Sequence, residues 1–480
     1  MKITTVILLM LSFTVGALAQ GNASERQQLV RVEAPLVALL HVRVIDGTGS
    51  VPQDDQTIVI SDGKIKSVGP SAAASVPAGA KMLDLTGYTV LPGLVGMHDH
   101  LFFPQGGSPP IYSDMGISFP RLYLALGVTT IRTTGSVAPF TDLEIKRLID
   151  SGRMFGPKIF VTAPYLEGKG AYTPVMHELT GPDDARRMVN FWADEGATSF
   201  KAYMNITRDE LRAVVEEAHK RGLKVTGHLC SIGYREAAEI GIDNLEHGLF
   251  PDSEFVPDKK PDQCPAGGAV NTSLSKLDIN GPAVQETIKT LVAKNVAVTS
   301  TLPVFEAGAP LTQNGIGAAR ALLNPRMLNT MSNDARVRYL ASRARVRADS
   351  DTANLVRKSM DFERAFSKAG GLLIAGLDPT GNGGIVAGFG DLREVELLVE
   401  AGFTPVEAIK IASLNGAKFL GEDSRIGSIA PGKQADLMVI KGNPATDIND
   451  IEKVEIVFKD GIGYDTEKLI QSVQGLVGIR

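Results

Sequence analysis

Short apolar segments alternate with segments of helical periodicity through the middle of this chain. Eight apolar segments lie at residues 94–98, 128–133, 158–163, 198–203, 224–229, 244–247, 296–302 and 372–378. Each has strand length and precedes a helix pattern, which indicates repeated β-α units and a parallel sheet. Eight such units within about 320 residues predict an α/β fold of the (β/α)8 TIM-barrel type. A doubly wound open sheet is the alternative that the pattern leaves open.

Three predicted helices carry start signals. The tetrapeptides TDLE at 141–144, TRDE at 207–210 and TPVE at 404–407 match the capping box. In this motif a threonine and a glutamate side chain satisfy free backbone N–H groups at the first turn. We therefore expect a helix to begin at each of these sites.

The two ends of the chain show β patterns instead. Asp-Gly pairs at 46–47 and 62–63 lie between β-branched residues and predict hairpins. Residues 427–444, GSIAPGKQADLMVIKGNP, have the same character. We predict that residues 20–90 and 421–480 form a small composite β-sandwich domain, with the barrel at 91–420 inserted between them.

The first residues, MKITTVILLMLSFTVGALAQ, combine a lysine, an apolar stretch and an Ala-x-Ala site. This pattern predicts a signal peptide over residues 1–19 and an exported protein, periplasmic or secreted. A retained anchor is the alternative, but the apolar stretch is shorter than the about 20 residues of a membrane span. No membrane anchor is expected after cleavage. Export would permit a disulfide between Cys230 and Cys264, whose pairing the sequence leaves open.

Charge narrows the range of partners. The formal net charge is −5 and acidic and basic residues are interspersed. Without a block of lysine and arginine, nucleic acid is not an expected partner. The sequence leaves the oligomeric state open, a homo-oligomer included.

Polar residues with metal-binding chemistry fall at the ends of predicted strands. They are His98, His100, Lys201, His228, His247 and Asp378. Residues two apart on a strand point to the same side, so His98 and His100 would face one way together. Each residue also has an ordinary reading, such as a core histidine, a solvated lysine or an Asp-Pro turn. However, four of the seven histidines of the chain belong to this set, and a barrel gathers such strand ends at one mouth.

The order HxH, Lys, His, His, Asp resembles the amidohydrolase superfamily in its binuclear form. YTVLPGLVGMHDHL at 88–101, ALGVTTIR at 125–132, NLEHG at 244–248 and IGSIAPGKQADLMVIKGNP at 426–444 carry the resemblance further. It covers roughly residues 36–465 and is nearest to the imidazolonepropionase-like and prolidase-like branch, whose members act on amide or peptide bonds.

The resemblance implies a set of roles. His98 and His100 would hold a buried divalent metal ion, with zinc the first expectation, and His228 and His247 a more exposed one. A carboxylated Lys201 would bridge the two ions. Asp378 would bind the buried ion and act as the catalytic proton carrier for a metal-bridging hydroxide.

The expected function is hydrolysis of a C–N bond in a small amide, peptide or cyclic amide. The alternatives are a lactonase or esterase, a mononuclear deaminase of the same superfamily, and a non-catalytic binding protein. Arg132, Tyr203 and His177 are candidate substrate-binding residues, each with a structural alternative. Long insertions after the sixth strand, at 250–281, and after the seventh, at 303–349, are expected to form lids over the site.

Overall fold

The computed structural model describes residues 24–106, 110–266, 268–310, 320–347, 351–380 and 385–479. The predicted signal peptide lies outside these residues. Within them, no helix has both the length and the apolar character needed to cross a membrane.

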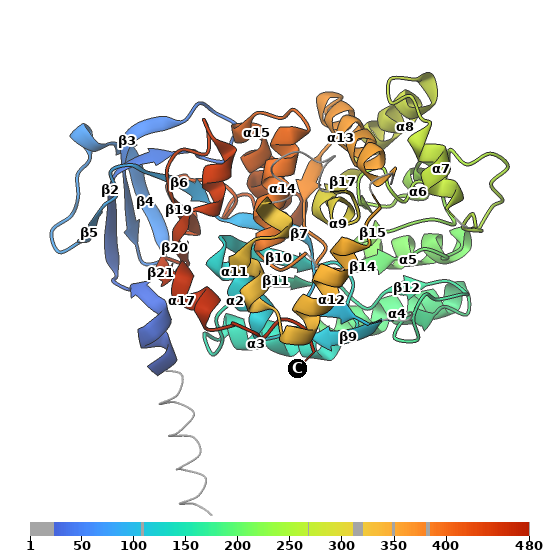
Figure 1. The fold of residues 1–480 in the computed structure, drawn as a ribbon, viewed down its shortest axis with the longest axis horizontal. Helices are drawn as coiled ribbons and strands as arrows, with labels where there is room; N and C mark the ends of the chain where they lie inside the picture. Colours follow the sequence, from blue (N-terminus) through green and yellow to red (C-terminus); the bar gives the residue numbers. More distant parts are fainter. Residues whose placement is uncertain are drawn as a thin grey trace, which may run out of the picture.

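Strands from both ends of the chain pair in one nine-stranded sheet, in the order β1-β21-β20-β19-β6-β2-β3-β4 with β5 beside β2. The strands are β1 (Val30–Val32), β2 (Leu36–Val44), β3 (Gln53–Ser61), β4 (Lys64–Pro70), β5 (Lys81–Asp84), β6 (Tyr88–Pro92), β19 (Leu437–Lys441), β20 (Val454–Lys459) and β21 (Ile462–Asp465). In Figure 1 the blue N-terminal strands lie against the red C-terminal ones at one side of the molecule. Antiparallel pairing of β6 with β19 joins the two ends, with Val90 opposite Val439. The exact domain boundaries remain a prediction.

The two Asp-Gly pairs behave differently. Asp62 and Gly63 both have positive φ, 51° and 76°, and form the tight turn between β3 and β4, as predicted. The pair at 46–47 is not a hairpin turn, because β2 and β3 are joined by a longer loop that runs from residue 45 to 52.

Parallel strands form the centre of the molecule. One sheet has the order β11-β10-β7 and the other β13-β12-β14-β15-β16-β17-β18. These strands are β7 (Leu94–Asp99), β10 (Val128–Thr133), β11 (Lys158–Val161), β12 (Leu166–Glu167), β13 (His177–Glu178), β14 (Ser199–Ala202), β15 (Lys224–Gly227), β16 (Asn244–Glu246), β17 (Ala297–Ser300) and β18 (Leu373–Ala375). Each of the eight predicted segments overlaps one of them, so the α/β prediction is confirmed.

Contacts at both edges connect these sheets to each other. Thr162, just after β11, forms a parallel bridge with Ser199 of β14. At the other end, the N–H of Asp378, just after β18, donates to the carbonyl of His98 in β7 at 2.8 Å. The ends of several strands are thereby brought together around one region.

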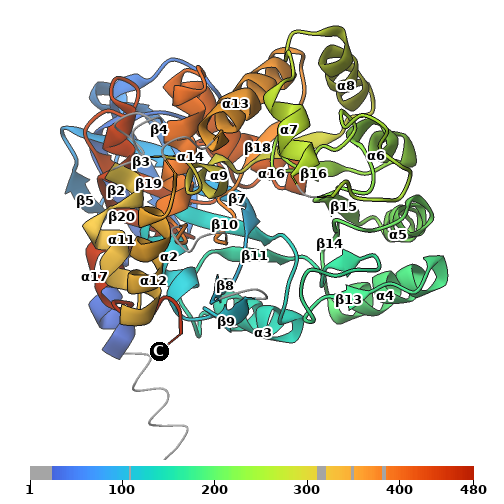
Figure 2. The ribbon, with the colours of Figure 1, turned by 45° about the vertical axis from the view of Figure 1, so that its right-hand side comes forward.

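Helices surround the parallel strands (Figures 1 and 2). The α-helices of the described chain are α2 (Ser118–Ala125), α3 (Pro139–Asp150), α4 (Pro182–Glu195), α5 (Arg208–Lys220), α6 (Tyr234–Ile240), α7 (Ala269–Ser275), α8 (Pro282–Ala293), α9 (Leu302–Glu306), α11 (Pro325–Thr330), α12 (Asn333–Ala344), α13 (Thr352–Lys368), α14 (Phe389–Glu400), α15 (Pro405–Lys410), α16 (Gly416–Leu420) and α17 (Thr466–Gln471), of which α17 packs against β20 and β21 instead. A two-stranded sheet of β8 (Phe102–Gln105) and β9 (Ile111–Asp114) follows β7. Because helices cover them, β7 and β10 are buried along their whole length.

Two of the three predicted capping boxes are confirmed. Thr207 caps α5 and Thr404 caps α15, each paired with the glutamate three residues later. The prediction at 141–144 is wrong, because α3 already begins at Pro139. Proline favours the first position of a helix, so Thr141 lies inside the first turn.

A disulfide joins Cys230 to Cys264. It ties the loop after β15 to the insertion that follows β16, over a sequence separation of 34 residues. The pairing that the sequence left open is therefore made in the structure.

Candidate metal centre

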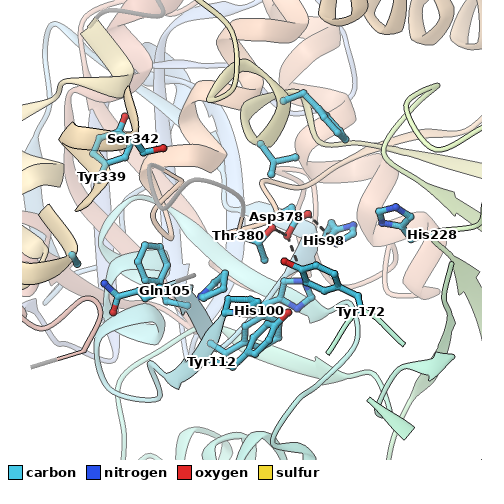
Figure 3. A pocket seen from close by; sticks show the side chains of 18 of the residues that line it. His98, His100, Gln105, Tyr112, Tyr172, His228, Tyr339, Ser342, Asp378 and Thr380 are labelled. Carbon is cyan, nitrogen blue, oxygen red and sulfur yellow. Dashed lines mark hydrogen bonds and ion pairs between the residues drawn. The ribbon is translucent and has the colours of Figure 1, made fainter. Parts of the chain in front are cut away.

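The two histidines of the HxH motif lie side by side at the end of β7. Both are buried, and their rings are 5.3 Å apart between centroids. Asp378, which follows β18, lies with them: its carboxylate oxygens are 3.9 Å from His98 Nε2 and 3.6 Å from His100 Nε2. Potential ligand atoms of these three residues lie within 4.8 Å of one another. Figure 3 shows the three side chains pointing toward a common space.

The other two predicted histidines extend this cluster. His247 follows β16 and lies between His98 and His228, with ring centroids 4.5 Å from each. Its Nδ1 is 2.8 Å from Thr301 Oγ1, and its Nε2 is buried without a hydrogen-bond partner among the described residues. A buried imidazole nitrogen without a partner costs free energy unless a ligand satisfies it.

Lys201 of β14 lies at the centre of this group. Its Nζ is 3.1 Å from His98 Nε2 and lies over the rings of Tyr165 and Tyr203, at 5.2 and 5.7 Å from the centroids. Burial lowers the pKa of this amine to about 8, because the charged form loses its solvation. At a given pH, a larger fraction of Lys201 is therefore neutral than of a solvent-exposed lysine.

Burial also keeps the histidines neutral. It lowers the pKa of His228 to about 3, and the nearby Lys201 acts in the same direction. The pKa values of His98, His100 and His247 are lowered well below the usual value, again chiefly by burial. Neutral imidazole is the form that binds a metal ion.

A second layer of groups fixes the histidine rings, and the sequence analysis did not assign it. Glu246 accepts from His98 Nδ1 at 2.7 Å, and the carbonyl of Gly135 lies 3.0 Å from His100 Nδ1. With Nδ1 engaged in this way, Nε2 of each ring faces the cluster, as metal-binding histidines require. The sequence did hold a signal for Glu246: Asn244 and Glu246 are polar residues at alternate positions of one short, buried strand, so both point to the same side.

Arg132 is part of this second layer and does not line the cavity. It is 1% exposed, and it donates to the Met97 carbonyl, to Asn244 Oδ1 and to Glu246 Oε1 at 2.8 Å. A guanidinium with these partners inside the protein is a structural group. Its placement therefore gives no support to the predicted contact with substrate.

A cavity of about 640 Å³ opens over the cluster. It is lined by His98, His100, Lys201, His228, His247 and Asp378 at one end, and by residues of β8, β9, α9 and α12 elsewhere. Tyr203 lines it, in line with its predicted position. His177 does not: its Nε2 contacts Asp184 at 3.0 Å on the surface.

Of the two predicted lids, one contributes to the cavity. The insertion after β17 supplies Phe305 and the wall formed by α12. The described part of the insertion after β16 supplies no lining residue; the disulfide holds it against the loop after β15 instead.

The chain matches the model of the amidohydrolase family over residues 89–462. The imidazolonepropionase of Phocaeicola vulgatus is 26% identical over 396 residues, which cover 80% of this chain and 84% of that protein. An uncharacterized protein of Mycobacterium tuberculosis is 27% identical over 218 residues, 44% of this chain and 55% of the relative. The chain thus spans about half the length of that curated relative.

Solved structures agree with the family match. A Bifidobacterium longum protein assigned as a prolidase superposes with a TM-score of 0.66 at 26% identity, covering 91% of this chain and 98% of that one. A Xaa-Pro dipeptidase superposes with a TM-score of 0.65 at 22% identity, covering 90% and 100%. At that identity the second likeness concerns the fold alone. From the family match and the shared fold, the chain belongs to the amidohydrolase family.

Proposed function

We propose that this protein is a metal-dependent hydrolase that cleaves a C–N bond in a small amide, peptide or cyclic amide. One observation carries the proposal: imidazole, amine and carboxylate groups from five parallel strands meet at one end of a substrate-sized cavity, and all of them except the half-buried His228 are buried. The C-terminal ends of parallel strands are where α/β barrels perform their chemistry. We propose in addition that the two parallel sheets close into such a barrel, which the contacts of Thr162 and Asp378 with neighbouring strands support.

The donor set fits two divalent metal ions. His98, His100 and Asp378 would hold one ion, and His228 and His247 the other. The fit rests on the neutral imidazoles and on the unpartnered, buried Nε2 of His247. Histidine with carboxylate suits zinc first. When bound, such ions lower the pKa of water and polarise a carbonyl group.

Lys201 is proposed to act as a carboxylated bridging ligand. Its Nζ lies 3.1 Å from a histidine nitrogen, and no carboxylate among the described residues forms an ion pair with it within 4.0 Å. Burial without a paired carboxylate favours the neutral amine, and the neutral amine is the form that can react with CO2 to give a carbamate and one proton. Carboxylation would convert this amine into an anionic ligand.

The remaining steps belong to side chains of the chain itself. Asp378 would take the proton of the attacking water and deliver it to the leaving nitrogen. Thr380 Oγ1 donates to Asp378 Oδ1 at 2.8 Å and orients that carboxylate. Tyr165, Tyr203 and Phe305 form apolar walls that exclude bulk water from the reacting bond.

Export is proposed as well. The N-terminal pattern of charge, apolar core and Ala-x-Ala supports it. The disulfide between Cys230 and Cys264 is consistent with an oxidising compartment.

Metal analysis and substrate screening test the proposal together. Metal-loaded protein is incubated with N-acyl amino acids, dipeptides, cyclic amides, lactones and simple esters, and metal content per chain is measured. We expect two ions per chain and turnover of amides. Turnover of esters or lactones alone would reject the C–N assignment, and one ion with release of ammonia would favour a deaminase.

A lysine substitution tests the bridging ligand. Lys201→Ala should lose one metal equivalent and most of the activity. Lys224→Ala is the matched control, because Lys224 lies on neighbouring β15 but donates to the Phe419 carbonyl, away from the cavity. Equal metal content in wild type and Lys201→Ala would remove the carbamate from the mechanism.

A further inference from the structure

The cavity has two chemically different ends. The candidate ligands form one end, and α12 forms part of the wall of the other. Figure 3 shows Tyr339 and Ser342 of α12 far from His98 and His228, with Gln105 on their side. Because residues three, four and seven apart share a helix face, Arg338, Ser342 and Arg345 lie along this wall together, and all three line the cavity.

The arginines near the end of α12 have different partners. Arg343 is buried and donates to the carbonyls of Ala307 and Ala309, which fastens the helix to the preceding loop. Arg338 is exposed and its Nε lies 2.6 Å from Asp334 Oδ2, so its positive charge is already paired with a carboxylate. Arg345 is exposed, lines the cavity and has no ion pair or hydrogen bond from its guanidinium among the described residues.

The cavity lining is otherwise aromatic and poor in acids. Its aromatic rings come from several separate segments of the chain and include Phe103, Tyr112, Tyr172 and Phe305. Among the described lining residues, Asp378 is the single carboxylate, and it belongs to the candidate metal centre. A cationic substrate group would therefore find no partner in the outer part, whereas an anionic one would find two guanidinium groups.

We propose that Arg345, assisted by Arg338, binds a carboxylate of the substrate at the outer end of the cavity. The substrate class is then an amide whose scissile C–N bond is separated from a carboxylate by an apolar or aromatic body. This inference rests on the proposed function and narrows it. A helix C-terminus favours a cation at position 345, but that effect does not require its guanidinium to line the cavity.

The size of the cavity agrees with a substrate of this kind. A volume of about 640 Å³ is in the middle of the range for pockets that enclose drug-sized ligands, about 300–1,000 Å³. An extended molecule can place its reacting bond at the metal centre and its body against the aromatic rings. Its carboxylate then reaches the charged wall without crossing an acidic surface.

Two graded sets of probes test the proposal. The first is 4-(acetylamino)benzoate and its phenylacetate and phenylbutyrate homologues, and the second is a series of dicarboxylic acid monoanilides of increasing length. Each carboxylate is compared with its neutral carboxamide twin. Release of the arylamine reports cleavage of the same bond in every case.

We expect at least one carboxylate to exceed its twin in kcat/KM by about tenfold or more, with the difference in KM. Arg345→Gln should lower the kcat/KM of the carboxylate about tenfold more than that of its neutral twin, which removes this preference. Arg336→Gln is the matched control: Arg336 is on the same helix, donates to Asn333 and does not line the cavity. Added salt should weaken the carboxylate preference in the wild type, since an exposed charge pair is screened.

The outcomes separate this proposal from the proposed function. Equal turnover of carboxylates and twins, or an unchanged preference in Arg345→Gln, would overturn the inference while amide hydrolysis stands. Turnover of other amides with none of these probes cleaved would overturn it as well. If no amide of any kind is cleaved by the metal-loaded protein, the proposed function fails and this inference fails with it.

Discussion

Replacement of Glu246 by glutamine should weaken metal binding at the His98 site. Glu246 is completely buried and its two oxygens accept from different donors: Oε2 from His98 Nδ1, and Oε1 from Arg132 and Thr226. A carboxamide has one oxygen and one NH2 group. If its oxygen stays with Arg132 and Thr226, its NH2 faces His98.

That arrangement changes the tautomer of the histidine. To accept from the NH2 group, His98 Nδ1 must give up its proton, and the proton of the neutral ring then occupies Nε2. A protonated Nε2 cannot bind a metal ion. Loss of such an outer hydrogen bond typically costs about 10- to 100-fold in metal affinity, which equals about 1.4–2.8 kcal/mol.

The substitution has a second consequence. Arg132 keeps its bonds to Met97 and Asn244 but loses its buried counter-charge, so stability should fall by about 3 kcal/mol. Competitive titration with a chelator measures metal affinity, and urea unfolding of the metal-free protein measures stability. The two readouts distinguish a positioning role of Glu246 from a merely structural one.

Glu363→Gln is a suitable control. Glu363 is equally buried but bonds to Ser300 and Ser359 rather than to a candidate ligand. Burial raises the pKa of Glu363 to about 8. Near neutral pH its carboxyl group is therefore mostly protonated, and replacing it with a neutral amide changes little. Metal affinity should stay at the wild-type level. A folded Glu246→Gln variant with wild-type affinity would refute the reasoning that this carboxylate sets the His98 tautomer.

Three further predictions concern stability. Burial raises the pKa of Asp142 from 3.8 to about 7, so between these values the folded state holds a proton that the unfolded state has lost, and stability falls as pH rises, by up to about 4 kcal/mol. Asp142→Asn should therefore stabilise the protein in urea unfolding at about pH 8 and hardly at about pH 4; equal effects at both would contradict this. Reduction of the Cys230–Cys264 disulfide, which closes a 34-residue separation, should cost about 4 kcal/mol by the chain-entropy relation, and an unchanged urea midpoint after reduction would argue against it. Thr207→Ala should cost about 1 kcal/mol because it removes a helix cap, whereas Thr141→Ala, inside α3, should cost less; the reverse order of unfolding midpoints would show that the cap was misassigned.

Local patterns in the sequence specified the secondary structure well. The eight apolar segments became strands because burial on both faces selects short, continuous β-branched runs. The start of α3 was misjudged because Pro139 and Thr141 are competing start signals two residues apart. The helix begins at the proline, which occupies its first position. The turn at Asp62 was predictable because two residues of positive φ are favoured by Asp-Gly.

The sequence by itself also determined which side chains could carry the chemistry. His98, His100, Lys201, His228, His247 and Asp378 stand out because histidine, lysine and aspartate are rare at the ends of apolar strands. Strand alternation fixed which of them point the same way. These properties depend on a few neighbouring residues and can be read along the chain.

Only the tertiary structure decided the contacts between distant segments. Glu246 contacts His98 across 148 positions, Arg132 turns inward to that carboxylate rather than toward substrate, and Cys230 meets Cys264. The position of Arg345 on the cavity wall depends on how α12 packs after a long insertion. The physical reason is that such contacts follow from the packing of whole elements, which no short stretch of sequence specifies.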